Sequence, residues 1–104
     1  MDRNQIEEKK LVVLFDDDSE YLIPAWIIAH NRAMYYASRE AGERRSACYY
    51  TEFDIAMKSQ EELIDWARGS MDWKDVEMFA VLVPRESVKL VPGDMWTNAG
   101  MKVI

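Results

Sequence analysis

Arginine and tyrosine side chains recur at intervals of three or four residues in one short stretch of the chain. They are Arg32, Tyr35, Tyr36 and Arg39, and on a helix this spacing places them on neighbouring parts of the surface. A guanidinium group grips phosphates or carboxylates through paired N–H donors, and tyrosine adds stacking area and a hydroxyl. Both residue types are enriched among the residues that contribute most to protein interfaces. We therefore predict that these four residues bind a partner.

A structural interpretation of the same four residues stays open. The two arginines could pair with carboxylates of the chain itself, for which Glu52 and Asp54 are candidates, while the tyrosines roof the core. Surface helices commonly carry charged side chains on their outer face, so this arrangement needs no partner.

Acidic side chains are concentrated between residues 46 and 79, where three basic residues stand against eight acidic ones. Carboxylates on one surface, spaced like backbone phosphates, could imitate a nucleic acid. The alternative is a solvated face that keeps the protein in solution. The residues predicted to form this acidic face are Glu61, Glu62, Asp65, Asp72 and Asp75.

The sequence contains no pattern typical of a catalytic or metal-binding site. His30 is the only histidine and Cys48 the only cysteine, and neither has partners at the spacing of a catalytic group or metal ligand set. The carboxylates of residues 16–18 follow a strand and could bind Mg²⁺, but no companion ligand accompanies them. We predict no catalytic residue, no metal and no cofactor, a solvated turn at 16–18 and a hydrogen-bonded core position for His30.

The strongest secondary-structure prediction is a helix over residues 24–41. Pro24 suits its first position and Gly42 its end. One apolar stripe of this helix contains Trp26, His30 and Met34, and we expect Trp26 to anchor the core. Before it, residues 9–16 and 20–23 read as two strands of a hairpin.

Later elements are signalled less evenly. Residues 43–58 fit either a tyrosine-rich strand or an irregular helix, and the second half favours helix. Ser59 with Glu62 is a capping-box pattern that begins a short helix ending at Gly69. Asp72 is expected to cap a further turn, and residues 78–83 read as a strand that Pro84 terminates.

These elements predict an α+β fold, a small antiparallel sheet packed against one long helix and a shorter second one. The 104 residues are expected to form one domain, because 49% hydrophobic and 31% charged residues are a globular balance. A net charge of −6 argues against direct nucleic-acid binding. The apolar runs are too short to cross a bilayer, and the sequence opens without an apolar signal segment. Together with the single cysteine, these features predict a cytoplasmic protein with no membrane partner.

Residues 85–104 combine chain breakers with apolar side chains, and we predict that they form an interaction tail. A domain of this size has little interior in which to bury them all. A homodimer formed through the tail is therefore expected, with contacts from Met95, Trp96 and Met101.

Three segments together resemble a family of small, mostly uncharacterised tailed-bacteriophage proteins. They are IPAWIIAHNRAMYYA at 23–37, LIDWA at 63–67 and MDWKDV at 71–76. The resemblance implies a virus-encoded protein at work in the host cytoplasm, and it carries no enzymatic residues. The leading hypothesis is a non-enzymatic binding protein that modulates or inhibits a host protein by surface occlusion. The alternatives are an acidic nucleic-acid mimic and a small metal-dependent hydrolase.

Overall fold

The computed structural model describes residues 9–15, 19–83, 96 and 99–104. Within these residues an antiparallel sheet has the strand order β3-β2-β1-β4, formed by β1 (Lys10–Leu14), β2 (Glu20–Pro24), β3 (Val81–Leu82) and β4 (Gly100–Val103). The helices are α2 (Ala25–Ala37), α3 (Glu43–Lys58), α4 (Gln60–Ser70) and α5 (Trp73–Val76), and a 3₁₀ turn, η1 (Glu77–Phe79), follows α5. The predicted α+β fold is confirmed, although two long helices are present where one was expected.

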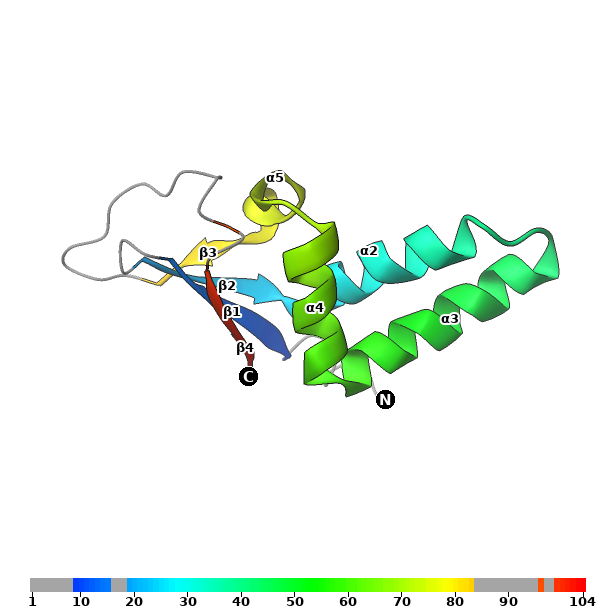
Figure 1. Ribbon diagram of the computed structural model, residues 1–104, viewed down its shortest axis with the longest axis horizontal. Coiled ribbons are helices and arrows are strands. Elements are labelled where there is room, and N and C mark those ends of the chain that lie inside the picture. Colours follow the sequence, from blue (N-terminus) through cyan, green and yellow to red (C-terminus); the bar gives the residue numbers. More distant parts are fainter. Residues whose placement is uncertain (1–8, 16–18, 84–95, 97–98) are drawn as a thin grey trace.

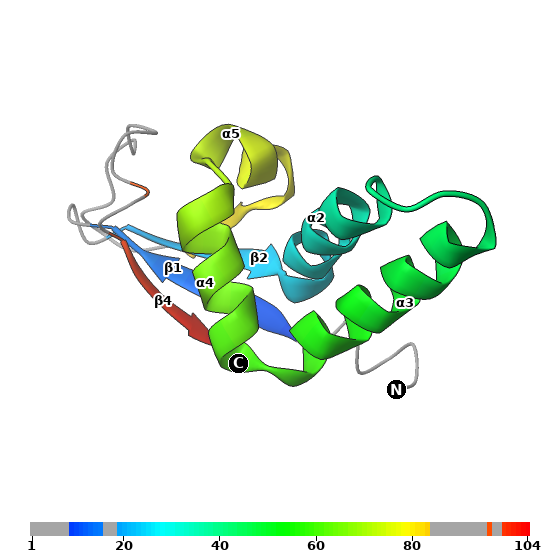
Figure 2. The ribbon, with the colours of Figure 1, turned by 45° about the vertical axis from the view of Figure 1, so that its right-hand side comes forward.

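The helices lie in two groups (Figure 1). Helix α4 crosses the sheet, with α5 beside it, whereas α2 and α3 run side by side as a hairpin that extends away from the sheet. Turning the molecule keeps both relations in view (Figure 2). No helix among the described residues is long and apolar enough to span a membrane.

The predicted strand hairpin is confirmed, and it leads directly into a helix. Strands β1 and β2 pair antiparallel, with Leu11 opposite Ile23 and Val13 opposite Tyr21. The Phe15 N–H donates to the Ser19 carbonyl at 2.9 Å and closes the connection. The predicted turn at 16–18 lies outside the described residues.

The core lies between one face of the sheet and the helices, with α4, α5 and the sheet-proximal parts of α2 and α3 all contributing to it. Alternate residues of β1 point into it because successive strand side chains face opposite sides, so Leu11, Val13 and Phe15 are buried. The aromatic centre of the core includes Trp96, which is 1% exposed and donates from its indole Nε1 to the Ala67 carbonyl at 2.9 Å. The ring of Trp73 lies 5.6 Å from that of Phe15, between centroids.

One prediction for the tail, the dimer contact through Trp96, is corrected by this packing. Trp96 was expected to contact a second copy, but its burial in the core leaves it no surface to offer. Met101 is half-buried against the core from β4, a strand that was not predicted because breakers surround it. Met95 lies outside the described residues.

Helix α2 departs from its predicted limits and register. It ends at Ala37 instead of residue 41. It buries an alanine at every fourth position from residue 25 to residue 37, a ridge of small side chains suited to close packing along α3. Trp26 is 37% exposed and His30 is also exposed, so their predicted core positions are wrong. Helix α2 packs on both α3 and α4, so it buries more than one stripe of its surface. A prediction based on one apolar stripe therefore placed Trp26 and His30 in the core incorrectly.

Residues 43–58 are helical throughout, which resolves the ambiguity in favour of α3. Gly42 precedes this helix with φ 61°, a left-handed conformation that glycine adopts without steric cost. It therefore helps to reverse the chain between α2 and α3 instead of closing the last turn of α2. Only Ala56 and Met57 are buried on α3, both near its C-terminal end.

Both predicted N-caps form, but the capping box predicted at Ser59 is only half made, because the Ser59 N–H bonds the Ala56 carbonyl instead of Glu62. The Ser59 hydroxyl accepts from the Glu62 N–H at 3.2 Å, and α4 continues to Ser70, one residue beyond the predicted end. Asp72 caps α5 through a capping box with Asp75. Of the strand expected over 78–83 only Val81–Leu82 forms, because η1 occupies the preceding residues.

Candidate functional site

Arg32 joins three helices and is buried. Its side chain is 10% exposed and forms ion pairs with Glu52 of α3 at 3.0 Å and Glu62 of α4 at 3.4 Å. It also donates to the Glu52 carbonyl at 2.9 Å. The prediction that Arg32 contacts a partner is therefore corrected: the open alternative, pairing with a carboxylate such as Glu52, is what the structure has. Asp54, the other candidate, pairs with Lys58 at 2.8 Å.

The other three predicted binding residues form an exposed aromatic cluster with Trp66 of α4. The Tyr35 and Tyr36 rings lie 5.3 and 5.7 Å from the Trp66 ring, between centroids. Tyr35 is 44% exposed, and Arg39 lies over its ring at 4.6 Å and donates to its hydroxyl. Trp66 is held by a 2.9 Å hydrogen bond from its Nε1 to Asn31 Oδ1. This cluster is accessible, but its rings already pack against one another in edge-on and tilted contacts.

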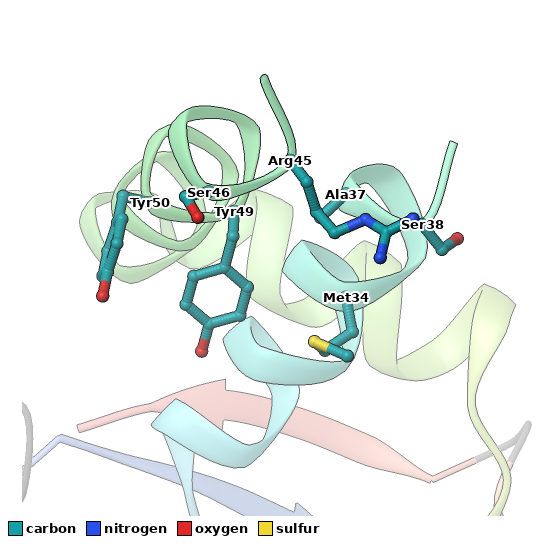
Figure 3. Close-up of a pocket in the computed structure, with 7 residues that line it drawn as sticks. All are labelled: Met34, Ala37, Ser38, Arg45, Ser46, Tyr49 and Tyr50. Atoms are coloured by element: carbon teal, nitrogen blue, oxygen red, sulfur yellow. The ribbon is translucent and has the colours of Figure 1, made fainter. Parts of the chain in front are cut away.

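A second exposed surface lies where the far parts of α2 and α3 meet. A groove of ≈ 340 Å³ is lined by Met34, Ala37, Ser38, Arg45, Ser46, Tyr49 and Tyr50. Figure 3 shows Met34 and Tyr49 facing the same space from opposite helices, while Arg45 extends across to α2. Met34 is 52% and Tyr50 70% exposed, so large apolar surfaces remain in contact with solvent.

The groove offers hydrogen-bond donors above an apolar floor. Among the described residues, the Arg45 side chain makes one hydrogen bond, from Nε to the Glu40 carbonyl at 3.3 Å. Its remaining guanidinium N–H groups can therefore bind an acceptor, since arginine carries five donors and no acceptor. Ser46 and Tyr50 also line the groove, so their hydroxyls add polar groups to its wall. The arrangement suits a ligand with an apolar body and a carboxylate or carbonyl group.

Tyr49 is fixed in the groove wall by His30. The two side chains share a hydrogen bond of 2.7 Å between the tyrosine hydroxyl and His30 Nδ1. Burial, and then the neighbouring Tyr50, raises the pKa of Tyr49 above its ordinary value. The hydroxyl therefore stays protonated at neutral pH and can donate to the imidazole. The expected hydrogen bond of His30 is present, but His30 itself is exposed, and the bond positions the half-buried Tyr49 in the groove wall.

In comparisons with known proteins, no family model, no curated protein and no solved structure matches this chain.

The groove was missed at the sequence level because residues 43–58 were ambiguous. Once this segment is helical, Arg45 and Tyr49 are four residues apart, as are Ser46 and Tyr50, so both pairs face one side. The same spacing drew attention to α2. The groove forms only where α3 packs beside α2, a relation that the spacing within one helix does not contain.

Three of the five predicted acidic-face residues are engaged within the chain. Glu62 pairs with Arg32, and Asp72 and Asp75 bond to each other's backbone N–H groups, with 2.8 Å from the Asp72 N–H to Asp75 Oδ2. Glu61 and Asp65 are exposed on α4. The carboxylates open to a partner are thus fewer than the sequence indicates.

The remaining reactive side chains do not form a cluster in the described part of the chain. No group of three or more His, Cys, Asp or Glu residues there could hold a metal ion. Partial burial, followed by the carboxylates of Glu52 and Glu40, raises the pKa of the Cys48 thiol. Cys48 is therefore a weak nucleophile at neutral pH, because the thiolate is the reactive form.

Proposed function

We propose that this chain is a non-enzymatic binding protein, which covers part of the surface of a host protein and so modulates or inhibits it. The groove between α2 and α3 is the contact surface in this proposal. The observation that carries it is the exposure of Met34 and Tyr50 in a groove that Arg45 also lines, which brings apolar area and cationic donors to one surface. The host setting rests on the resemblance to bacteriophage proteins.

Residue type and geometry support the choice of this surface. Tyrosine, arginine and methionine are enriched in interfaces, and tyrosine and arginine dominate the residues whose truncation weakens binding most. A groove between two helices accepts an apolar side chain of the partner while Arg45 binds an acceptor at its edge. Tyr49, held by His30, keeps the wall of the groove in place before the partner arrives.

The decisive experiment compares matched variants in partner capture from a bacterial lysate, followed by calorimetry with the purified partner. Arg45→Ala and Tyr50→Ala each remove a groove residue, whereas Arg44→Ala removes the neighbouring exposed arginine, which does not line the groove. Each groove variant should weaken binding by about 2 kcal/mol, roughly 30-fold in Kd. Arg44→Ala should bind like the unmodified protein.

Two results would count against the proposal. Groove variants that bind the captured partner as tightly as the unmodified chain would place the contact elsewhere. Binding that falls steeply with salt and is insensitive to Tyr50→Ala would favour the acidic mimic, since screening acts on charge and not on apolar contact.

A further inference from the structure

Strand β4 presents hydrogen-bonding groups to the outside of the described sheet. Lys10 and Ile104 exchange both backbone hydrogen bonds, at 3.2 and 2.9 Å. In an antiparallel ladder, residue pairs that exchange hydrogen bonds alternate with pairs that exchange none. The pair of Lys102 with Val12 lies two positions from the pair of Ile104 with Lys10, so it also exchanges hydrogen bonds. The N–H and C=O groups of Lys102 therefore point to β1. Those of Met101 and Val103 point away from the sheet, at its β4 edge.

The outer face of the sheet has a hollow beside this edge. It measures ≈ 240 Å³, and Leu14, Gly100 and Lys102 are among its lining residues. Gly100, opposite Leu14, contributes no side chain there. On the same face, one residue past the end of β4, Ile104 is 61% exposed. One short edge thus carries both a hollow and a protruding apolar side chain.

We propose that a second copy of this chain pairs with β4 antiparallel, about a two-fold axis at Lys102. In this register Met101 of each copy lies opposite Val103 of the other, so both outward-facing residues exchange their hydrogen bonds. Ile104 of each copy lies opposite Gly100 of the other and enters the hollow beside Leu14. The same surface patch serves both copies, as a two-fold interface requires.

This interface keeps residues 85–104 as the predicted dimer contact but narrows it to the β4 edge, and it is independent of the groove. It uses the backbone of β4 and the side chain of Ile104 instead of Trp96. Figure 1 shows β4 at the opposite end of the molecule from the closed end of the α2–α3 hairpin, so each copy keeps its groove. A monomeric protein could still bind through the groove, and a dimer could form without a host partner.

The first experiment measures sedimentation from low to high micromolar concentration. Val103→Pro removes an outward-facing N–H, and proline is tolerated at such an edge position, so this variant should remain folded and become monomeric. Leu82→Pro is the matched control. Leu82 lies in β3, at the opposite edge of the described sheet. The Val83 N–H donates to the Glu20 carbonyl at 2.8 Å, and because bonding directions alternate along a strand, the Leu82 N–H points away from β2. The control should still dimerise.

A second variant tests the hollow without altering the backbone. A Cβ at Gly100 would lie 3.8 Å from the Leu14 carbonyl oxygen and 3.9 Å from its Cβ, which is ordinary contact. The monomer therefore accepts Gly100→Leu, whose side chain would occupy the space proposed for Ile104 of the second copy. Gly100→Leu should sediment as a folded monomer.

The register is tested by charge. Two Lys102 side chains face each other across the proposed axis, and like charges in directly opposed positions weaken strand pairing. An equimolar mixture of the unmodified chain with Lys102→Glu should form mixed dimers about three- to tenfold tighter than either alone. The proposal is overturned by a monomer at every concentration, by a dimer that survives both Val103→Pro and Gly100→Leu, or by a mixture with no preference for mixed dimers.

Discussion

The two ends of the α2–α3 hairpin use the same residue types in different ways. Near the sheet, Arg32 is covered by α4 and neutralised by Glu52 and Glu62. At the far end, Arg45 is exposed and bonds one backbone carbonyl among the described residues. The difference comes from what covers each end, because the buried residues of α3 lie in its last turn. An arginine therefore becomes a structural clamp or a binding group according to the elements packed on it.

Aromatic side chains follow the same division. Trp96, 1% exposed, fills the core beside the sheet, whereas Tyr50, 70% exposed, stands at the groove. Buried aromatics contribute to stability through the area they remove from water. Exposed aromatics contribute nothing comparable until a partner covers them. The hairpin end near the sheet thus carries stability, and the far end is free to carry binding.

The largest expected effect is the loss of Trp96. Trp96→Ala should lower the free energy of unfolding by about 3 to 5 kcal/mol, because it opens a cavity and removes the indole donor from the Ala67 carbonyl. Urea denaturation measures the change. Tyr50→Ala, at the exposed end, should shift stability by no more than about 0.5 kcal/mol. Equal losses in the two variants would remove the distinction between the two regions.

Arg32→Ala should have the next largest effect on stability, about 2 to 3 kcal/mol. The substitution leaves the carboxylates of Glu52 and Glu62 without their cation. The loss of stability is smaller than for a fully buried ion pair, because the Glu62 side chain is 48% exposed. Arg45→Ala is the matched control and should be close to neutral in the same urea titration. A neutral Arg32→Ala would mean that the clamp does not hold the helices together.

Trp26→Ala tests the residue that the sequence placed in the core. The side chain is 37% exposed and packs edge-on against Phe79, with 6.3 Å between ring centroids. A loss of about 1 kcal/mol is expected, well below that of Trp96→Ala. Thermal unfolding of the two variants side by side measures the difference. A loss above about 3 kcal/mol would restore Trp26 as a core anchor.

The features that the sequence predicted correctly are local ones. Local signals were sufficient where one residue type determines the backbone, as at Ser59 and Asp72, whose caps form as predicted. The strand hairpin was likewise predictable, because apolar and β-branched residues flank a polar turn. The α+β class followed from these elements.

Long-range packing was beyond the reach of the sequence patterns. Helix α2 contacts α3, α4 and the sheet, so its buried surface is wider than one periodic stripe, and Ile28 and Arg32 are buried where Met34 is not. Strand β4 depends on pairing with β1 from the other end of the chain, with Leu11 opposite Val103, and so distant a contact leaves no local signal in the sequence. The groove needed both helices of the hairpin to be assigned before its residues could be grouped.

A comparison of two tyrosines sharpens the assignment of the binding surface. Tyr50→Ala should weaken partner binding strongly, whereas Tyr35→Ala should weaken it by less than about 1 kcal/mol, because Tyr35 already packs against the rings of Tyr36 and Trp66. Both variants should change folding stability little. Calorimetry with the purified partner separates them. The reverse order would move the site to the aromatic cluster that the sequence first indicated.

The smallest effect is expected from the two exposed carboxylates of α4. In Glu61→Gln with Asp65→Asn both side chains keep their shape and lose their charge, and neither makes an ion pair or a side-chain hydrogen bond in the described structure. Folding stability should therefore change by no more than about 0.5 kcal/mol.

Partner affinity should be nearly unchanged if the groove is the contact, because these side chains do not line it. An acidic mimic requires the opposite result, since each lost charge removes part of the field that a nucleic-acid-binding protein recognises. Calorimetry at low and high salt decides the matter: a large loss of affinity confined to low salt would transfer the function from the far end of the hairpin to the acidic surface of α4.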